Sequence, residues 1–143
     1  MMKNILIVTF LLLTSVQADF VRDDALEVVN DTTTCLMWQD NLESKTVQKT
    51  WTEAIDHCEG LSFAGFDDWR LPNFNELYSI GDRSRYNPAI KTAFSNVVSY
   101  NYWSSTTGAS DTSRAWGVSF RYGSDGNGGK GTSRYVRCVR AGQ

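Results

Sequence analysis

Histidine and proline are scarce in this sequence of 143 residues, which contains one histidine and two prolines. The histidine, His57, cannot make a zinc site without cysteine or carboxylate partners at ligand spacing. We also find no Ser-His-Asp or Cys-His arrangement that includes it. We therefore expect His57 to be a surface or boundary residue of a protein that is not an enzyme. We expect no catalytic residues, no metal and no cofactor.

Long apolar runs are absent except at the start of the chain. Lys3 is followed by an almost wholly apolar stretch, residues 5–13, and by a small-residue cleavage motif that ends at Ala18. We interpret residues 1–18 as a secretory signal peptide, because the run is too short to span a bilayer. The alternative is a retained N-terminal anchor helix. With the signal removed, residues 19–143 form a single domain of an exported protein, periplasmic or extracellular, with no membrane span.

The glycine-rich segment 123–131 lacks the residues of a known ion-binding or phosphate-binding loop. Ser124 stands where a phosphate loop requires its first glycine, and Gly131 stands where serine or threonine must follow Lys130. A calcium loop needs more carboxylates than Asp125 alone. We interpret the segment as the flexible tip of a hairpin that could contact a ligand.

Charge is unevenly distributed along the chain. Residues 19–111 contain 7 basic and 15 acidic residues, a net charge of −8, whereas residues 112–143 contain 6 basic residues and one acid, a net charge of +5. A basic face of this kind attracts polyanions. The alternative is that these basic side chains pair with the acidic first part of the fold.

The middle of the chain predicts two helices joined by a rigid connector. Residues 50–60 have apolar positions at helical spacing that place Cys58 on the inner face, and Thr50 and Glu53 form a capping box. Asn73 and Glu76 form a second box, which predicts a helix over residues 74–80. Between the helices, Pro72 forces an extended backbone.

Strand patterns occupy the two ends of the domain. We expect short strands at residues 26–29 and 35–39, and then strands at 102–105, 115–120 and 134–139. Helices followed by antiparallel strands indicate an α+β domain. Three cysteines in an exported chain indicate one disulfide and one leftover thiol.

Several motifs occur together in an order typical of one bacterial family. They are Asp31-Thr32-Thr33-Thr34, Leu36-Met37-Trp38-Gln39-Asp40, Trp51 through Cys58, Asp68-Trp69-Arg70-Leu71-Pro72-Asn73, Glu76-Leu77, Tyr102-Trp103-Ser104-Ser105-Thr106, Ala115-Trp116 with Phe120, and Tyr135-Val136-Arg137-Cys138-Val139-Arg140. In this order they resemble the Lcl C-terminal domain family, found in many exported bacterial proteins. The resemblance covers nearly all of the mature chain.

The resemblance implies a C-type-lectin-like fold, in which two helices pack on a twisted antiparallel sheet and the chain ends meet. It also implies a disulfide between Cys58 and Cys138. The named member of the family is a collagen-like adhesin whose globular end binds sulfated polysaccharides. Cys35 stands where the family usually has glycine, and we expect it to be a buried free thiol, the alternative being a point of dimer linkage.

These observations favour a carbohydrate-binding module whose ligand is an anionic polysaccharide or another surface polymer. The alternative is a structural or protein-binding domain of a surface assembly; we expect no nucleic-acid partner, and an oligomer stays open. The candidate ligand contacts are Arg114, Arg121, Tyr122, Lys130, Arg134 and Arg140. The residues with an expected structural role are Trp38, Trp51, Asp68, Trp69, Arg70, Pro72, Trp103 and Trp116.

Overall fold

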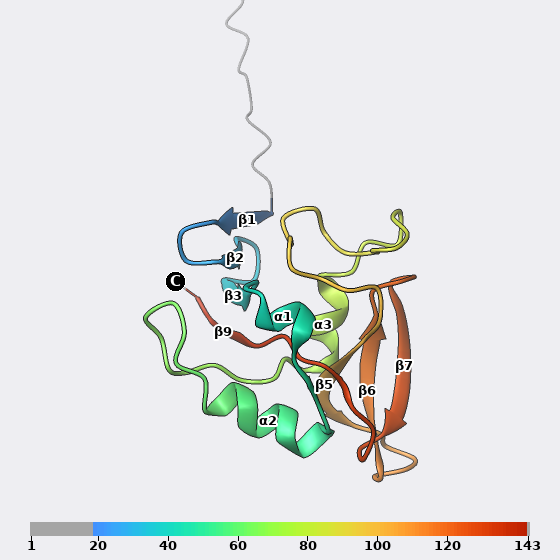
Figure 1. The fold of residues 1–143 in the computed structure, drawn as a ribbon. Coiled ribbons are helices and arrows are strands. Elements are labelled where there is room, and N and C mark those ends of the chain that lie inside the picture. The colour runs from blue at the N-terminus through green and yellow to red at the C-terminus, as the bar shows by residue number, and fades with distance from the viewer. Residues whose placement is uncertain (1–18, 143) are drawn as a thin grey trace, which may run out of the picture.

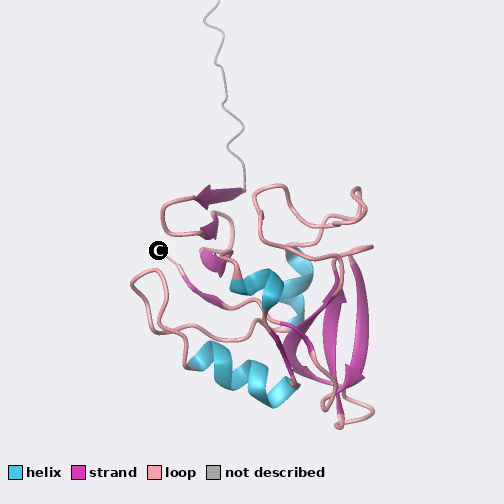
Figure 2. Cartoon of the chain, in the orientation of Figure 1, coloured by secondary structure: helices cyan, strands magenta, loops and turns pink. Residues whose placement is uncertain are grey.

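The computed structural model describes residues 19–142; the predicted signal peptide, residues 1–18, lies outside the described residues. The described chain combines helices and strands, which confirms the α+β class (Figures 1 and 2). The helices are α1 (Glu43–Thr46), α2 (Trp51–Glu59) and α3 (Phe74–Ser79). The strands are β1 (Phe20–Asp23), β2 (Val28–Asp31), β3 (Leu36–Gln39), β4 (Gln48–Lys49), β5 (Asn101–Thr107), β6 (Arg114–Ser119), β7 (Ser124–Gly129), β8 (Arg134–Tyr135) and β9 (Val139–Ala141). Within this part of the chain, no helix is long and apolar enough to cross a bilayer.

The strands form two sheets. The first has the order β1-β2-β3-β9 and the second the order β4-β8-β5-β6-β7. All pairs are antiparallel except β5 with β8. The first and last described strands, β1 and β9, both belong to the four-stranded sheet, so the two ends of the described chain lie in the same sheet (Figure 1).

The predicted helix caps are confirmed. The backbone N–H of Thr50 donates to the carboxylate of Glu53 at 3.0 Å, at the start of α2. At the start of α3, Asn73 and Glu76 exchange two hydrogen bonds of 2.8 Å each. Each exchange satisfies backbone donors that a helix start leaves without a partner, so both starts agree with the sequence.

Two predictions for the last third of the chain are wrong. The glycine-rich segment is not a hairpin tip, because Ser124–Gly129 is a regular strand, β7, paired over its full length with β6. The turn of this hairpin lies before the glycine-rich segment, between β6 and β7, and ends at Gly123, whose φ is 72°. The predicted strand 134–139 is interrupted, so its beginning, β8, and its end, β9, belong to different sheets.

Two hydrophobic clusters fill the domain, and the disulfide lies in one of them. Cys58 on α2 is bonded to Cys138, which directly precedes β9, and both cysteines are fully buried. This confirms the disulfide that the family resemblance implied. Trp69 and Trp103 lie in the same cluster, whereas Trp38 lies in the other. The bridge ties the helix to the end of the chain across 80 residues of sequence.

The connector before α3 is anchored at each of its predicted structural residues. Trp69 is buried and its indole N–H donates to the carbonyl of Phe63 at 3.1 Å. The guanidinium of Arg70 forms two bonds of 2.8 and 2.7 Å with the carboxylate of Glu76. Pro72 is buried, and its carbonyl accepts a bond of 2.8 Å from the N–H of Ser105 in β5. The connector therefore fixes α3 against the second sheet.

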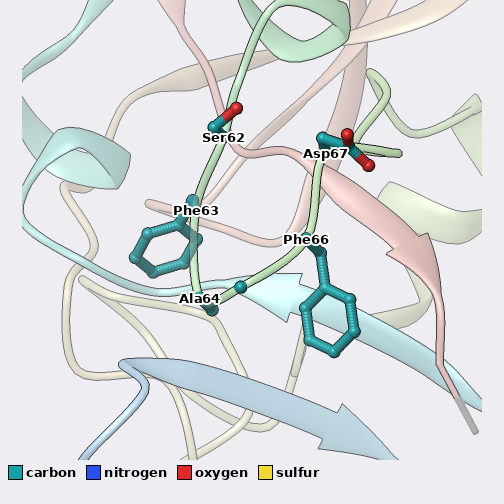
Figure 3. Close-up of a pocket in the computed structure, with 6 residues that line it drawn as sticks. Ser62, Phe63, Ala64, Phe66 and Asp67 are labelled. Atoms are coloured by element: carbon teal, nitrogen blue, oxygen red, sulfur yellow. The ribbon is translucent and has the colours of Figure 1, made fainter.

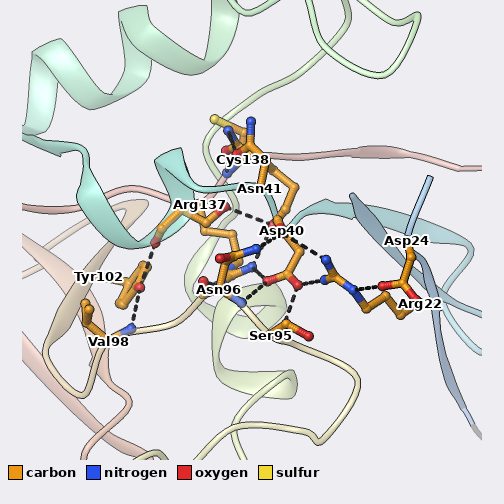
Figure 4. A network of polar contacts seen from close by, with 12 residues as sticks. Arg22, Asp24, Asp40, Asn41, Ser95, Asn96, Val98, Tyr102, Arg137 and Cys138 are labelled. Atoms are coloured by element: carbon orange, nitrogen blue, oxygen red, sulfur yellow. Dashed lines mark hydrogen bonds and ion pairs between the residues drawn. The ribbon is translucent and has the colours of Figure 1, made fainter. Parts of the chain in front are cut away.

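A buried ion-pair network joins the two ends of the chain (Figure 4). Arg137 is fully buried and donates to the carboxylate of Asp40 at 2.7 Å, and to the carbonyls of Gln39 and Asn96 at 2.6 and 2.5 Å. Arg22 pairs with the other side of the same carboxylate. Burial lowers the pKa of Arg137 to about 10, while the Tyr102 hydroxyl opposes this shift. The network holds Arg137 within the fold and leaves it inaccessible to a ligand.

Candidate ligand-binding surface

Arg140, one of the six predicted ligand contacts, is already occupied by a partner within the fold. Its side chain is 8% exposed and forms bonds of 2.6 and 3.1 Å with the carboxylate of Asp68. Its guanidinium carbon lies 3.6 Å from the centre of the Phe66 ring. The hydrogen bond from Arg140 lowers the pKa of Asp68. Arg137 and Arg140 therefore pair with carboxylates of the acidic first part of the chain.

The other four basic residues of the last third behave differently. Among residues 19–142 they form no ion pair with a carboxylate. These residues are Arg114, Arg121, Lys130 and Arg134.

Arg134, the first residue of β8, packs over an indole ring. Its guanidinium carbon is 4.4 Å from the centre of the Trp103 ring. Desolvation by partial burial lowers its pKa, and the positive charge of Arg114 lowers it further. Its contact with a backbone acceptor, the Gly126 carbonyl at 3.5 Å, is long. Arg134 is thus a half-buried cation, fixed in direction, with no anion beside it.

Two glycines make room for this guanidinium. A Cβ atom on Gly128 would lie 2.1 Å from Nη2 of Arg134, and one on Gly117 would lie 2.8 Å from its Nη1. Any residue other than glycine at positions 117 and 128 would collide with Arg134, because a carbon atom does not approach a nitrogen atom this closely in van der Waals contact. Gly117 of β6 and Gly128 of β7 therefore leave the surface beneath Arg134 free of side chains, and we call these two residues the glycine floor.

Lys130 and Arg114 lie at the same end of the β6–β7 hairpin, because Arg114 pairs with Gly129 at the end of β7. The ammonium of Lys130 lies 3.9 Å from the centre of the Trp51 ring and donates to the Thr107 hydroxyl at 3.0 Å. The guanidinium of Arg114 donates to the Asn127 side chain at 2.7 Å and to its carbonyl at 3.2 Å. We call Arg114, Lys130 and Arg134, together with Trp51 and Trp103, the tryptophan cluster.

Arg121 and Tyr122 lie in the turn at the opposite end of this hairpin. There they meet Tyr86, which was not among the predicted residues. Nε and Nη2 of Arg121 each lie 3.4 Å from the Tyr86 hydroxyl, and this hydrogen bonding lowers the pKa of Tyr86. The Asn87-Pro88 pair after Tyr86 marks a turn and could have placed this ring on the surface. We call Tyr86, Arg121 and Tyr122 the tyrosine cluster.

A polar cleft of about 300 Å³ lies beside β8 and the start of β5. Tyr100 lines it, and its carbonyl accepts a bond of 3.1 Å from the N–H of Phe120, the residue before Arg121. The ring of Tyr100 is 64% exposed. The cleft lining is Gln48, Tyr100, Asn101, Thr132, Ser133, Arg134 and Tyr135. These residues include one cation and no carboxylate.

A second hollow, of about 380 Å³, is formed by the single loop after α2 (Figure 3). The backbones of Phe63 and Phe66 exchange hydrogen bonds of 2.9 and 3.0 Å, and Ala64 and Gly65 between them have positive φ angles. The charged residue in its lining is Asp67. Because an acid repels an anion, this hollow does not suit an anionic ligand.

The hydroxyl groups after Trp103 serve the fold. The Ser104 hydroxyl donates to the carbonyl of Trp116 at 2.7 Å, and the Thr106 hydroxyl accepts from the N–H of Phe74 at 2.9 Å. The ring of Trp116 packs on Phe74 of α3, with ring centres 5.6 Å apart.

His57 and Cys35 lie away from these clusters. Nε2 of His57 is 3.6 Å from a carboxylate oxygen of Glu43, and its side chain is 21% exposed, as expected of a boundary residue. The expectation of a buried thiol is wrong, because Cys35 is exposed in the turn between β2 and β3. Its φ is 59°, a left-handed conformation that favours glycine.

The family model of the Lcl C-terminal domain matches residues 27–140. The chain belongs to this family. The match covers most of this Lcl C-terminal domain, from β2 into β9, and includes the disulfide and all four cations of the two clusters. A comparison with curated proteins finds no match to the chain.

Proposed function

We propose that this Lcl C-terminal domain is an exported, non-enzymatic module that binds anionic polysaccharide. One observation carries the proposal: Arg114, Arg121, Lys130 and Arg134 have no carboxylate partner among the described residues. Three of them lie against aromatic rings. Cations held in place without a counterion bind sulfate or carboxylate groups through charge-assisted hydrogen bonds.

The arrangement of the two clusters favours an extended ligand. Arg114 and the turn that carries Arg121 lie at opposite ends of β6, a strand of six residues, so roughly 17 Å of strand separates them, and Arg134 lies over Gly117 between them. One small anion cannot reach both clusters at once. A polymer with repeated acidic groups can contact both, and each contact adds to a single binding event.

Export and a C-type-lectin-like architecture are part of the same proposal. A buried disulfide forms and persists in oxidising compartments, which supports a periplasmic or extracellular location. The α+β class, the shared sheet of β1 and β9, and the bridge from α2 to the segment before β9 support the lectin-like comparison.

Retention on a heparin column at increasing salt tests the proposal. We expect the wild type to elute at higher salt than the Arg114→Ala, Arg134→Ala variant. Removing two arginines that contact sulfate groups of heparin weakens binding and reduces its salt dependence. The control is Lys45→Ala, Lys91→Ala, which removes the same charge outside both clusters and should elute with the wild type. Elution of the Arg114, Arg134 variant at the wild-type salt concentration would reject this site.

A further inference from the structure

Two tyrosine rings of the tyrosine cluster stand open to solvent, although tyrosine rings of folded domains are more often half-buried. Tyr86 is 59% exposed and Tyr122 is 56% exposed. Their ring centres are 5.5 Å apart and their planes are inclined at 43°. The two rings therefore form one contiguous aromatic surface rather than two isolated side chains.

The backbones that carry these rings are fixed to each other. The N–H of Asn87 donates to the carbonyl of Arg121 at 3.0 Å, and the N–H of Ala89 donates to the carbonyl of Phe120 at 2.6 Å. Gly123, with φ of 72°, closes the turn through a bond of 2.8 Å to the carbonyl of Ser119. Because both loops are tied, the aromatic surface exists before a ligand arrives, which reduces the entropy lost on binding.

Arg121 adds one cation to this surface. Its guanidinium carbon lies 5.5 Å from the centre of the Tyr122 ring. Its contacts with the Tyr86 hydroxyl are long, at 3.4 Å each, and in the described chain it has no carboxylate partner. Its donors are therefore available to an anionic group placed beside the rings.

We propose that Tyr86, Tyr122 and Arg121 form a stacking subsite for one acidic sugar unit, a pyranose ring that carries a sulfate or carboxylate. This inference rests on the proposed function and adds a reason for the domain to prefer carbohydrate. One face of a pyranose consists of C–H groups, which pack on an aromatic ring, while Arg121 binds the acidic substituent. Tyrosine suits this contact because a large rigid ring loses little conformational entropy.

The subsite makes a different contribution from the tryptophan cluster. Arg114, Lys130 and Arg134 attract any polyanion through charge, whatever its backbone. The rings of Tyr86 and Tyr122 discriminate, because a polyanion without sugar rings has no C–H face to place on them. Removing the rings should therefore affect polysaccharide and inorganic polyanion unequally.

The experiment compares a heparin oligosaccharide with inorganic polyphosphate as probes, using the full mature domain and calorimetric titration. We expect Tyr86→Ala, Tyr122→Ala to bind heparin about tenfold more weakly than the wild type, the loss typical of one stacked ring. Its affinity for polyphosphate should not change. Tyr86→Phe, Tyr122→Phe keeps both rings and should retain heparin affinity, and Leu42→Ala, at an equally exposed apolar side chain, serves as the control.

Each outcome decides between the two proposals. Heparin affinity of the alanine variant equal to that of the wild type, or an equal loss for both probes, overturns the subsite while leaving polysaccharide binding in place. A wild-type protein that binds no heparin at all overturns the proposed function and the subsite with it. Both tyrosines are exposed, so unchanged thermal unfolding of the variants confirms that any loss arises at the surface.

Discussion

The basic residues of the last third divide according to whether a carboxylate lies within reach. Arg137 finds Asp40 and Arg140 finds Asp68, and both carboxylates come from the first half of the chain. Arg134 is in the same segment, yet its nearest neighbours are an indole ring and two glycines. The sequence predicted a basic surface but could not distinguish these arginines, because their carboxylate partners, Asp40 and Asp68, lie far away in the sequence.

At the scale of single residues, Glu76 predicts a loss of stability in acid. Burial raises its pKa, but the hydrogen bonds from Arg70 and from the backbone of Asn73 outweigh burial, so the pKa lies below its ordinary value of 4.5. A carboxyl group with a lowered pKa in the folded state stabilises the fold above its unfolded pKa and loses this contribution as the pH falls through the folded pKa.

The unfolding temperature measured between neutral pH and pH values below 4.5 tests this effect. We expect Glu76→Gln to flatten the acid limb of the profile relative to the wild type. Glu59→Gln, at an exposed position at the end of α2, should leave the limb unchanged. Identical limbs for the wild type and Glu76→Gln would contradict the role given to this carboxylate.

At the scale of elements, local patterns with local partners were predictable and patterns that depend on distant contacts were not. Both capping boxes involve residues three apart, and both are present. Strand β7 consists of three glycines with Ser124, Asp125 and Asn127, all residue types that favour turns. It forms a strand because β6 pairs with it along its full length, and Arg134 covers one of its glycines, Gly128. The sequence analysis named two of the three residues of the tyrosine cluster, Arg121 and Tyr122, but not Tyr86.

The glycine floor yields a prediction for the hairpin. Gly128→Ala places a methyl group where the Arg134 guanidinium lies, and the flexible end of that side chain moves more easily than the strand. We expect heparin retention to fall toward that of Arg134→Ala, with little change in the unfolding temperature.

Gly129→Ala is the matched control, because nothing lies within 4 Å of its added Cβ. It should behave as the wild type in both measurements. Equal heparin retention of the Gly128→Ala and Gly129→Ala variants would show that the position of Arg134 is irrelevant to binding.

At the scale of the whole molecule, the first and last parts of the chain are joined by the disulfide and by the buried ion pairs of Asp40 with Arg22 and Arg137. The predicted single sheet is in fact two, because residues 136–138 leave the second sheet and enter the first at β9. The bond between Cys58 and Cys138 closes this path across 80 residues. Closing so long a loop removes many conformations from the unfolded chain.

We expect Cys58→Ala, Cys138→Ala to lower the free energy of unfolding by about 2–5 kcal/mol. Chemical denaturation followed by tryptophan fluorescence measures it, with Cys35→Ala as the control, because Cys35 is a free and exposed thiol. A double variant as stable as the control would show that the bridge is dispensable.

The most direct test of polysaccharide capture is amide chemical-shift mapping of the mature domain titrated with a heparin oligosaccharide. We expect the largest shifts along the β6–β7 hairpin, around Arg114, Lys130 and Arg134 and, at its turn, around Arg121. Shifts confined to residues 19–82, or no shifts at saturating oligosaccharide, would contradict this expectation.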